Sequence, residues 1–196
     1  MAFTERSEAT RRAILAAARE HLTTRGYEGT TIRAVASEAG IDPSMVMRYF
    51  GSKAGLFGAA VAVDLRLPDP RSVRRDRLGE VLARHFVARW EGGLSDEATT
   101  LLLRASTTNP EAAARARSVF ETQVLSFLRR GVGSGRQAER RAGLVSAQVL
   151  GVALSRYVLE LRPIVALSAE ELVSVLAPVL QHYLTGALEA GVGEVS

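Results

Sequence analysis

The sequence contains no cysteine, a single lysine and no long apolar run. Without cysteine, the chain can form no disulfide framework and no thiolate metal site, and it has no cysteine nucleophile. No apolar stretch approaches the roughly 20 residues that a membrane-spanning helix requires. The first twenty residues are charged and lack the apolar centre of a secretory signal. We therefore expect a soluble, cytoplasmic protein that does not associate with membranes.

Residues that support catalysis or metal binding are also scarce. The three histidines, at positions 21, 85 and 182, are far apart, and no His-Glu-x-x-His or similar metal spacing occurs. No nucleophile elbow is present. The glycines of residues 131–135 lack the preceding strand and the Gly-Lys-Ser/Thr of a phosphate-binding loop, so we interpret them as a linker. The sequence predicts no catalytic residue, no metal site and no cofactor, and we do not expect an enzyme.

Apolar residues make up 47% of the chain, which is enough for a sizeable core. No Asn-Gly or Asp-Gly hairpin and no sustained apolar/polar alternation indicates a strand. The fold class that we expect is therefore all-α. The formal net charge of +4 is compatible with binding a polyanion but is too small to indicate it alone.

Residues 30–50 carry the most informative pattern in the chain. Apolar side chains recur at a helical spacing from Ile32 onward, and a threonine before them can cap this helix. Gly40 stands where a helix ends in a left-handed conformation. Asp42 can cap a second helix, and Pro43 suits its first position. The segment predicts two short helices joined by a tight turn.

The second of these helices has two different faces. At about 100° per residue, Val46, Tyr49 and Phe50 fall on one side, which must dock on neighbours because so short a helix is not stable alone. The opposite side carries Pro43, Ser44, Met47 and Arg48. A helix-turn-helix presents such a face to the major groove of DNA. An ordinary helical hairpin with a solvated outer face is the alternative.

The residues around this segment form a specific set of features. They comprise an opening helix, a Gly-Tyr pair, two threonines, the turn, a Tyr-Phe pair and a Ser-Lys start of a further helix. The residues that carry these features are Arg11, Ile14, Leu15, Ala18, Gly26, Tyr27, Thr30, Thr31, Ala39, Gly40, Ile41, Tyr49, Phe50, Ser52, Lys53 and Leu56. In this order and spacing, residues 11–57 closely resemble the DNA-binding domain of the tetracycline-repressor (TetR) family. One position departs from the family pattern, because Met47 replaces a tyrosine whose hydroxyl meets a phosphate.

The resemblance implies a sequence-specific transcriptional regulator. Members of the family are usually homodimeric repressors that a small molecule releases from a palindromic DNA operator, and the effector of this chain is unidentified. Arg48 and Ser44 are then assigned to base edges, with Thr31 and Lys53 on the DNA backbone. The residues expected to contact DNA are Thr31, Arg33, Pro43, Ser44, Met47, Arg48 and Lys53.

A second hypothesis follows from Met47 and from the modest net charge. In that case the chain is a helical small-molecule- or partner-binding protein whose degenerate helix-turn-helix does not read DNA. Selection of bound sequences from a random DNA pool distinguishes the two hypotheses.

Two prolines, Pro68 and Pro70, mark the clearest boundary in the chain, because neither can continue a helix. We expect a helix-turn-helix DNA-binding domain over residues 1–51 and a connecting helix over residues 52–67. A helical ligand-binding and dimerisation domain is expected over residues 68–196.

The last two long helices, expected over residues 136–160 and 168–189, carry the candidate dimer interface. Small residues repeat every four positions on the first helix, and apolar residues form a broad stripe on the second. Such a pair suits a four-helix bundle built from two chains, and packing within one chain is the alternative. The expected interface residues are Gly143, Ala147, Gly151, Ser155, Leu172, Val175, Leu176, Val179 and Tyr183.

Candidates for the lining of an effector pocket are aromatic and apolar residues with a few polar side chains among them. Small-molecule sites have this composition, but so do ordinary cores. The pocket residues that we expect are Phe86, Trp90, Leu102, Phe120, Gln123, Val124, Gln148 and Tyr157.

Overall fold

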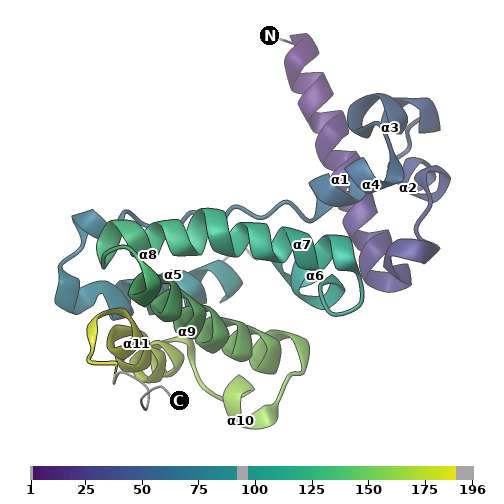
Figure 1. The fold of residues 1–196 in the computed structure, drawn as a ribbon. Coiled ribbons are helices and arrows are strands. Elements are labelled where there is room, and N and C mark those ends of the chain that lie inside the picture. The colour runs from purple at the N-terminus through teal and green to yellow at the C-terminus, as the bar shows by residue number, and fades with distance from the viewer. Residues whose placement is uncertain (1, 92–96, 189–196) are drawn as a thin grey trace, which may run out of the picture. The chain divides into compact units, whose positions relative to one another are not determined.

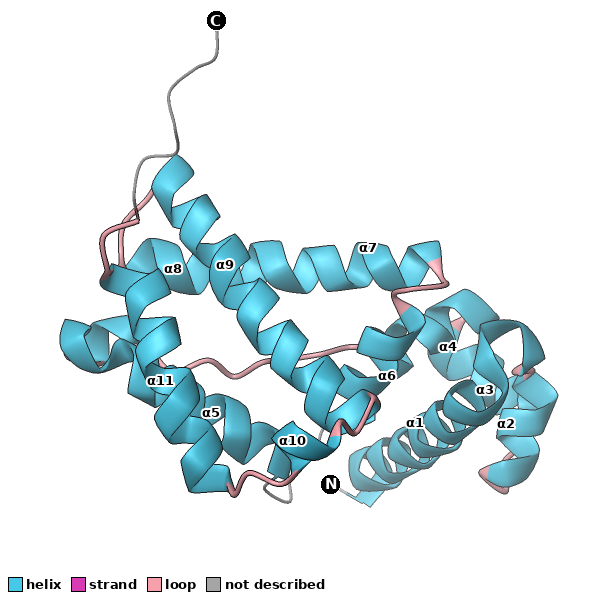
Figure 2. Cartoon of the chain, turned by 90° about the horizontal axis from the view of Figure 1, so that it is seen from below, coloured by secondary structure: helices cyan, strands magenta, loops and turns pink. Residues whose placement is uncertain are grey.

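The structure is a computed structural model of the 196-residue chain, and it describes residues 2–91 and 97–188. Every regular element within these ranges is helical (Figure 1, Figure 2), which confirms the expected all-α fold. The described chain divides into two compact units. The first unit contains residues 2–64 and 97–118, and the second contains residues 65–91 and 119–188.

The first unit is built on the long helix α1, against which α2, α4 and α6 pack. At Gly26 the backbone leaves helical geometry, with φ at 67°. Ile14, Val35 and Val46 are fully buried and link α1, α2 and α3 into one core. The helices are α1 (Ala2–Gly29), α2 (Ile32–Glu38), α3 (Pro43–Phe50), α4 (Lys53–Ala60), α6 (Glu97–Ala105) and all but the last residue of α7 (Pro110–Val119).

Short polar side chains cap the helices of the first unit. Thr31 Oγ1 accepts a hydrogen bond of 3.1 Å from the backbone N–H of Ala34 at the start of α2. Ser52 Oγ accepts one of 2.9 Å from Gly55 at the start of α4. Each of these bonds satisfies a backbone donor that the helix itself leaves unpaired. The sequence predicted a threonine cap for α2 and placed Ser52 at the start of the next helix.

The connecting helix expected over residues 52–67 is wrong in its extent, because α4 ends at Ala60. The guanidinium of Arg19 donates a 3.0 Å hydrogen bond from Nε to the Ala60 carbonyl. A continuing helix needs that carbonyl for the N–H of the residue four positions later. Val61 and Val63 instead bury their side chains in a non-helical segment.

The second unit is organised around α5 and α11, which lie side by side (Figure 1, Figure 2). It contains two π-helical segments, η3 and η4, in which backbone hydrogen bonds join residues five positions apart instead of four. The elements are η1 (Pro70–Ser72), η2 (Arg75–Arg77), α5 (Leu78–Glu91), η3 (Phe120–Val124), α8 (Leu125–Gly131), α9 (Arg136–Ala153), η4 (Leu154–Val158), α10 (Arg162–Val165) and α11 (Ala169–Thr185).

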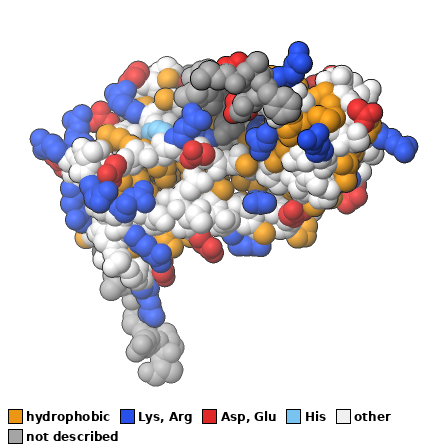
Figure 3. Space-filling model, turned by 90° about the horizontal axis from the view of Figure 1, so that it is seen from above, with side chains coloured by type: hydrophobic (Ala, Val, Ile, Leu, Met, Phe, Trp, Pro, Cys, Tyr) orange, Lys and Arg blue, Asp and Glu red, His pale blue; other side chains and the backbone are white. Residues whose placement is uncertain are grey.

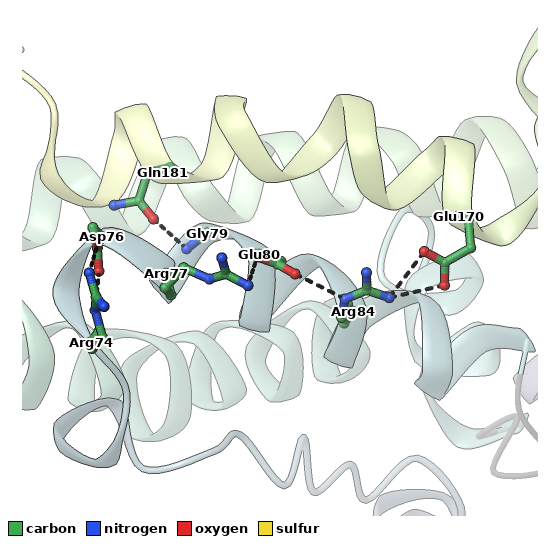
Figure 4. Close-up of polar contacts among 8 residues, drawn as sticks. All are labelled: Arg74, Asp76, Arg77, Gly79, Glu80, Arg84, Glu170 and Gln181. Carbon is green, nitrogen blue, oxygen red and sulfur yellow. Dashed lines mark hydrogen bonds and ion pairs between the residues drawn. The ribbon is translucent and has the colours of Figure 1, made fainter.

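Gly79 allows α5 and α11 to approach each other closely. A Cβ added at this glycine would lie 2.4 Å from the carbonyl oxygen of Ala177 and 2.5 Å from the backbone nitrogen of Gln181, both in α11. The Gln181 amide uses this proximity, because its Oε1 accepts a 2.8 Å hydrogen bond from the N–H of Gly79 (Figure 4). Exposed ion pairs follow along the same seam, including one of 2.9 Å between Arg84 and Glu170. Such exposed pairs add only about 0.2–1 kcal/mol each.

Arg141 is a buried cation in the second unit, with 6% of its surface exposed. Its Nη1 donates to the carbonyl of Tyr183 at 2.7 Å, and its Nη2 donates to the carbonyl of Gly186 at 2.8 Å. These carbonyls belong to the C-terminal end of α11, where the helix dipole favours a positive charge. Arg141 therefore joins α9 to the end of α11 through a fork with fixed geometry.

We expect Arg141→Lys to lower the free energy of unfolding by about 1.5–3 kcal/mol, because one ammonium cannot reproduce two hydrogen bonds to separate carbonyls. The measurement is urea unfolding followed by circular dichroism at a fixed protein concentration. Arg136→Lys, at the exposed start of α9, is the matched control and should change stability by less than about 0.5 kcal/mol. Equal effects of the two substitutions would contradict this role of Arg141.

Candidate nucleic-acid interface and ligand site

The helix α3 buries one side and exposes the other. Val46 is fully buried, and the rings of Tyr49 and Phe50 are half-buried. The opposite side is open to solvent over the length of the helix, at Pro43, Ser44, Met47 and Arg48. The helix therefore presents a continuous outer face of the kind that can enter a groove of DNA.

Asp42 fixes the start of this outer face. Its Oδ1 accepts a 2.8 Å hydrogen bond from the backbone N–H of Ser44 and a 2.5 Å bond from the Ser44 hydroxyl. These bonds, the one from the hydroxyl first, hold the pKa of the Asp42 carboxyl below its ordinary value. Since the Ser44 hydroxyl donates its proton to Asp42, its lone pairs are left to accept from a base edge or from water.

The two arginines of this surface are exposed, Arg33 on α2 and Arg48 on α3. Neither guanidinium makes an ion pair with another residue of the described chain. Each can therefore turn its planar fork toward guanine or phosphate without breaking an existing bond. Met47 lies between them in the sequence with 44% of its surface exposed, so its thioether does not fill the core.

Lys53 is held at the start of α4 rather than extended into solvent. Its Nζ donates a 3.3 Å hydrogen bond to the carbonyl of Glu28 and lies 4.5 Å from the centroid of the Tyr27 ring. The Tyr27 ring in turn meets Phe57 edge to face, with 5.0 Å between centroids. Thr31 uses its side-chain oxygen as a helix cap but remains exposed. All seven residues expected at the DNA thus belong to the first unit.

The space-filling view (Figure 3) shows how charged side chains are distributed over one face of the molecule. On the face drawn in Figure 3, lysine and arginine side chains are interspersed with acidic ones. The net charge of +4 is modest, so a surface that binds a polyanion would rely on the placement of individual cationic side chains.

Sequence reasoning missed two contacts between α1 and α3. The hydroxyls of Ser7 and Tyr49 lie 2.9 Å apart. The guanidinium carbon of Arg11 lies 5.6 Å from the centroid of the Phe50 ring. Both contacts join residues about 40 positions apart, and no local signal connects them. The four-residue spacing of Ser7 and Arg11 places them on one face of α1, which is the only trace that the sequence offers.

In the second unit the structure brings three of the expected pocket residues together. The rings of Trp90 and Tyr157 are stacked with 4.7 Å between centroids, and Phe86 lies 6.2 Å from Trp90 and 6.4 Å from Tyr157. Phe86 and Trp90 come from α5, and Tyr157 comes from the π-helical segment η4. This aromatic cluster (Phe86, Trp90 and Tyr157) has the side-chain composition that sites for apolar or planar molecules use.

A carboxylate adjoins the aromatic cluster at the end of α5. Glu91 Oε1 accepts from the Tyr157 hydroxyl at 3.0 Å, and Arg156 Nη2 lies 2.7 Å from the same oxygen. Burial, followed by the hydrogen bond to Glu91, raises the pKa of the Tyr157 phenol well above its ordinary value. Arg156 also donates to the carbonyls of Ile164 and Val165 in α10. One guanidinium thus joins the end of α5, η4 and α10.

The remaining pocket candidates are placed differently. Phe120, Gln123 and Val124 lie in η3, the other π-helical segment, and Gln148 is half-buried on α9. Gln123 Oε1 accepts a 2.7 Å hydrogen bond from the backbone N–H of Leu65. Leu102 is buried in the first unit, so the structure does not place it in the unit that holds the other seven. π-Helical segments are frequent at functional sites, and no sequence pattern marked them.

Two of the expected interface residues are wrong. Leu172 and Leu176 are only 1% and 2% exposed, because α11 buries them within its own chain, so a second copy cannot reach them. Gly143, Ala147, Gly151 and Val175 are exposed, while Ser155, Val179 and Tyr183 are half-buried.

Leu150 and Leu154, which sequence reasoning missed, are large apolar side chains exposed on α9 and at the start of η4. They lie beside the exposed small residues Gly151 and Ala147 along the helix. The exposed surface of α9 is therefore partly apolar, which is a feature of surfaces that bind other proteins.

None of the helices within residues 2–91 and 97–188 is long and apolar enough to cross a membrane. Within the same residues, no group of three or more histidine, aspartate or glutamate side chains is arranged to hold a metal ion.

Comparisons with known proteins identify both parts of the chain. Residues 14–60 match the model of bacterial regulatory proteins of the tetR family, and residues 76–184 match that of the tetracyclin repressor-like C-terminal domain. None of the curated proteins compared with the chain matches it.

The solved structures that share the fold include the following three. A TetR-family regulator from Streptomyces coelicolor is 27% identical over 89% of this chain and 94% of its own, with a TM-score of 0.54. A transcriptional regulator from Rhodococcus is 23% identical over 90% of this chain and 98% of its own, with a TM-score of 0.62. A regulator from Saccharomonospora viridis, solved in complex with choline, is 22% identical over 90% of this chain and 97% of its own, with a TM-score of 0.57.

The raised pKa of Tyr157 predicts how stability depends on alkaline pH. The unfolded chain ionises this phenol near its ordinary pKa of about 10, whereas the folded chain keeps it neutral. The free energy of unfolding therefore falls as the pH rises above about 10. We expect Tyr157→Phe to make this loss less steep, measured by urea unfolding at several alkaline pH values. Tyr183→Phe is the control, because the Tyr183 hydroxyl hydrogen-bonds to no described residue. An unchanged alkaline slope in Tyr157→Phe would contradict the prediction.

Proposed function

The chain belongs to the TetR family of DNA-binding transcriptional regulators, and we propose that it is a homodimeric repressor which a small molecule releases from a palindromic operator. The observation that carries this proposal is the outer face of α3, which is capped at its start by Asp42 and exposed along its length. Residues 1–51 are the proposed DNA-binding domain and residues 68–196 the ligand-binding and dimerisation domain, acting in the cytoplasm by binding rather than by catalysis.

Sequence recognition is assigned to Arg48 and Ser44, whose side chains can reach base edges in the major groove. Met47 takes the place at which the family pattern has a tyrosine, and an apolar side chain there suits a thymine methyl group better than a phosphate. Pro43 shapes the same contact, and Arg33 reaches a base or a phosphate. Thr31 and Lys53 are assigned to the DNA backbone.

Dimerisation is assigned to the exposed surface of α9 together with Val175 of α11. A Cβ added at Gly143 or Gly151 would meet no atom within 4 Å, so both glycines face open space in the single chain. Small residues on a helix surface allow a second helix to approach closely, and Leu150 and Leu154 supply apolar area beside them. Two copies of α3 must then meet successive major grooves about 34–36 Å apart.

The effector is assigned to the aromatic cluster of Phe86, Trp90 and Tyr157, with Glu91 as its polar group. The regulator from Saccharomonospora viridis was solved in complex with choline, which supports a small-molecule site in this fold. The dimer can hold its two DNA-binding domains at different distances from each other. A ligand that binds one of these conformations more tightly shifts the dimer toward it. A modest shift defeats simultaneous docking on two grooves.

The proposal is tested by selecting bound sequences from a random pool of double-stranded DNA with the purified protein at near-physiological salt. We expect one palindrome to be enriched, with half-sites about one helical turn apart or a multiple of that spacing. The enriched operator then serves to screen small molecules for release of the protein. No enrichment, from protein shown to be folded and dimeric, would overturn the proposal in favour of a helical binding protein that does not read DNA.

Two substitutions separate base contacts from phosphate contacts. Arg48→Ala should cost about 1–3 kcal/mol of operator binding and relax the preference at one base pair of each half-site. Lys53→Ala should weaken all DNA sequences about equally and reduce the slope of log affinity against log salt by about 1. Both are measured by fluorescence anisotropy on operator and scrambled DNA. Arg162→Ala, which removes one charge from the second unit, is the control and should leave both readouts unchanged.

The dimer surface is tested by Gly151→Leu. The single chain tolerates this side chain because no atom lies within 4 Å of the added Cβ, whereas the proposed close approach of a second helix does not. We expect the dimer dissociation constant, measured by sedimentation, to rise at least about tenfold, which corresponds to 1.4 kcal/mol. Ala88→Leu adds the same bulk to the exposed surface of α5 and should associate like the parent. Equal association of both variants would place the interface elsewhere.

A further inference from the structure

The N-terminal turns of α1 contact the last turn of α3 through two pairs of side chains. The Ser7 hydroxyl lies 2.9 Å from the Tyr49 hydroxyl, and the Arg11 guanidinium carbon lies 5.6 Å from the centroid of the Phe50 ring. Ser7 and Arg11 are one turn apart on the same face of α1. Their partners are consecutive residues of α3.

These contacts constrain the rotation of α3 about its own axis. Consecutive residues of a helix point about 100° apart, so the contacts at Tyr49 and Phe50 restrain α3 from two different directions around its axis. Val46 is the one fully buried side chain of α3. A single buried side chain does not by itself prevent the helix from rotating about its axis. At the helix's outer radius of roughly 5–6 Å, a rotation of about 20° displaces a side-chain tip by about 2 Å. Such a displacement is large compared with the tolerance of a hydrogen bond.

We propose that Ser7 and Arg11 are positioning residues for operator recognition, which hold α3 at the rotation that presents Ser44 and Arg48 to the bases. This inference rests on the proposed reading of the operator by α3. Neither residue needs to touch DNA in this role. Ser7 acts through Tyr49, and Arg11 acts through the face of the Phe50 ring, to which a guanidinium is attracted by the ring quadrupole.

The Ser7–Tyr49 contact is tested by a double-mutant cycle on the operator obtained by selection. Ser7→Ala and Tyr49→Phe each remove one hydroxyl of the pair, and each should weaken operator binding about three- to tenfold. The double variant should be no weaker than either single variant, because the same contact is lost in all three. Ser7→Thr keeps a hydroxyl and should restore binding.

Thr10→Ala is the matched control for the cycle. Its hydroxyl donates only within α1, to the carbonyl of Arg6 at 2.9 Å, so binding should equal that of the parent. Circular dichroism and thermal unfolding establish that every variant is folded. The ratio of operator affinity to scrambled-DNA affinity is measured as well, and it should fall in Ser7→Ala and Tyr49→Phe. A general loss of folded protein weakens both DNAs alike and leaves this ratio unchanged.

Arg11 has a separate test, because an arginine near DNA could also contact a phosphate directly. If Arg11 positions α3, Arg11→Ala lowers operator affinity and leaves the slope of log affinity against log salt unchanged. A slope that becomes shallower by about 1 would show a phosphate contact and overturn the positioning role of Arg11.

The outcomes separate this inference from the proposed function. If the parent protein selects an operator but the effects of Ser7→Ala and Tyr49→Phe are absent or simply additive, the positioning role of Ser7 is wrong and the proposed function stands. If the parent protein selects no sequence at all, the proposed function fails and this inference fails with it.

Discussion

An eight-residue helix is too short to be stable in water, so α3 takes its order from the residues that surround it. Asp42 caps its start, Val46 anchors its middle in the core, and Tyr49 and Phe50 attach its last turn to α1. Of the outer face, Pro43, Met47 and Arg48 take no part in these contacts, whereas Ser44 is hydrogen-bonded to Asp42 and remains exposed. The residues that order α3 and those of its outer face are thus largely different, and Ser44 belongs to both sets.

The second unit is held together by a different balance of interactions. α5 and α11 pack closely at Gly79, and α11 adds buried leucines to the core, whereas the exposed ion pairs along their seam add little. Arg141 is the exception among the charges, since it is buried and its two hydrogen bonds go to backbone carbonyls. A buried guanidinium whose partners are carbonyls needs a fixed geometry, so we expect this unit to tolerate changes at the exposed ion pairs better than changes at Arg141.

Features that depend on neighbouring residues could be predicted from the sequence. The caps at Thr31, Asp42 and Ser52 follow from short-range chemistry, as does the all-α fold. Features that depend on distant residues could not. The end of α4 at Ala60 is coupled to Arg19, 41 positions earlier. The apolar stripe of α11 gave no means to distinguish side chains buried in their own chain from side chains left for a second copy. The π-helical segments, which hold four of the pocket candidates, carry no known pattern.

Arg156 connects the aromatic cluster of the second unit to α10. Its guanidinium is shared by Glu91, which also accepts from Tyr157, and by the carbonyls at Ile164 and Val165 in α10. Val165 and the nearby Leu161 expose large apolar side chains. A ligand that competes for Glu91 would change the bond between Glu91 and Arg156. The hydrogen bonds from Arg156 to the carbonyls of α10 would change with it. The proposed effector would act through this link only if it binds two arrangements of the proposed dimer with different affinities.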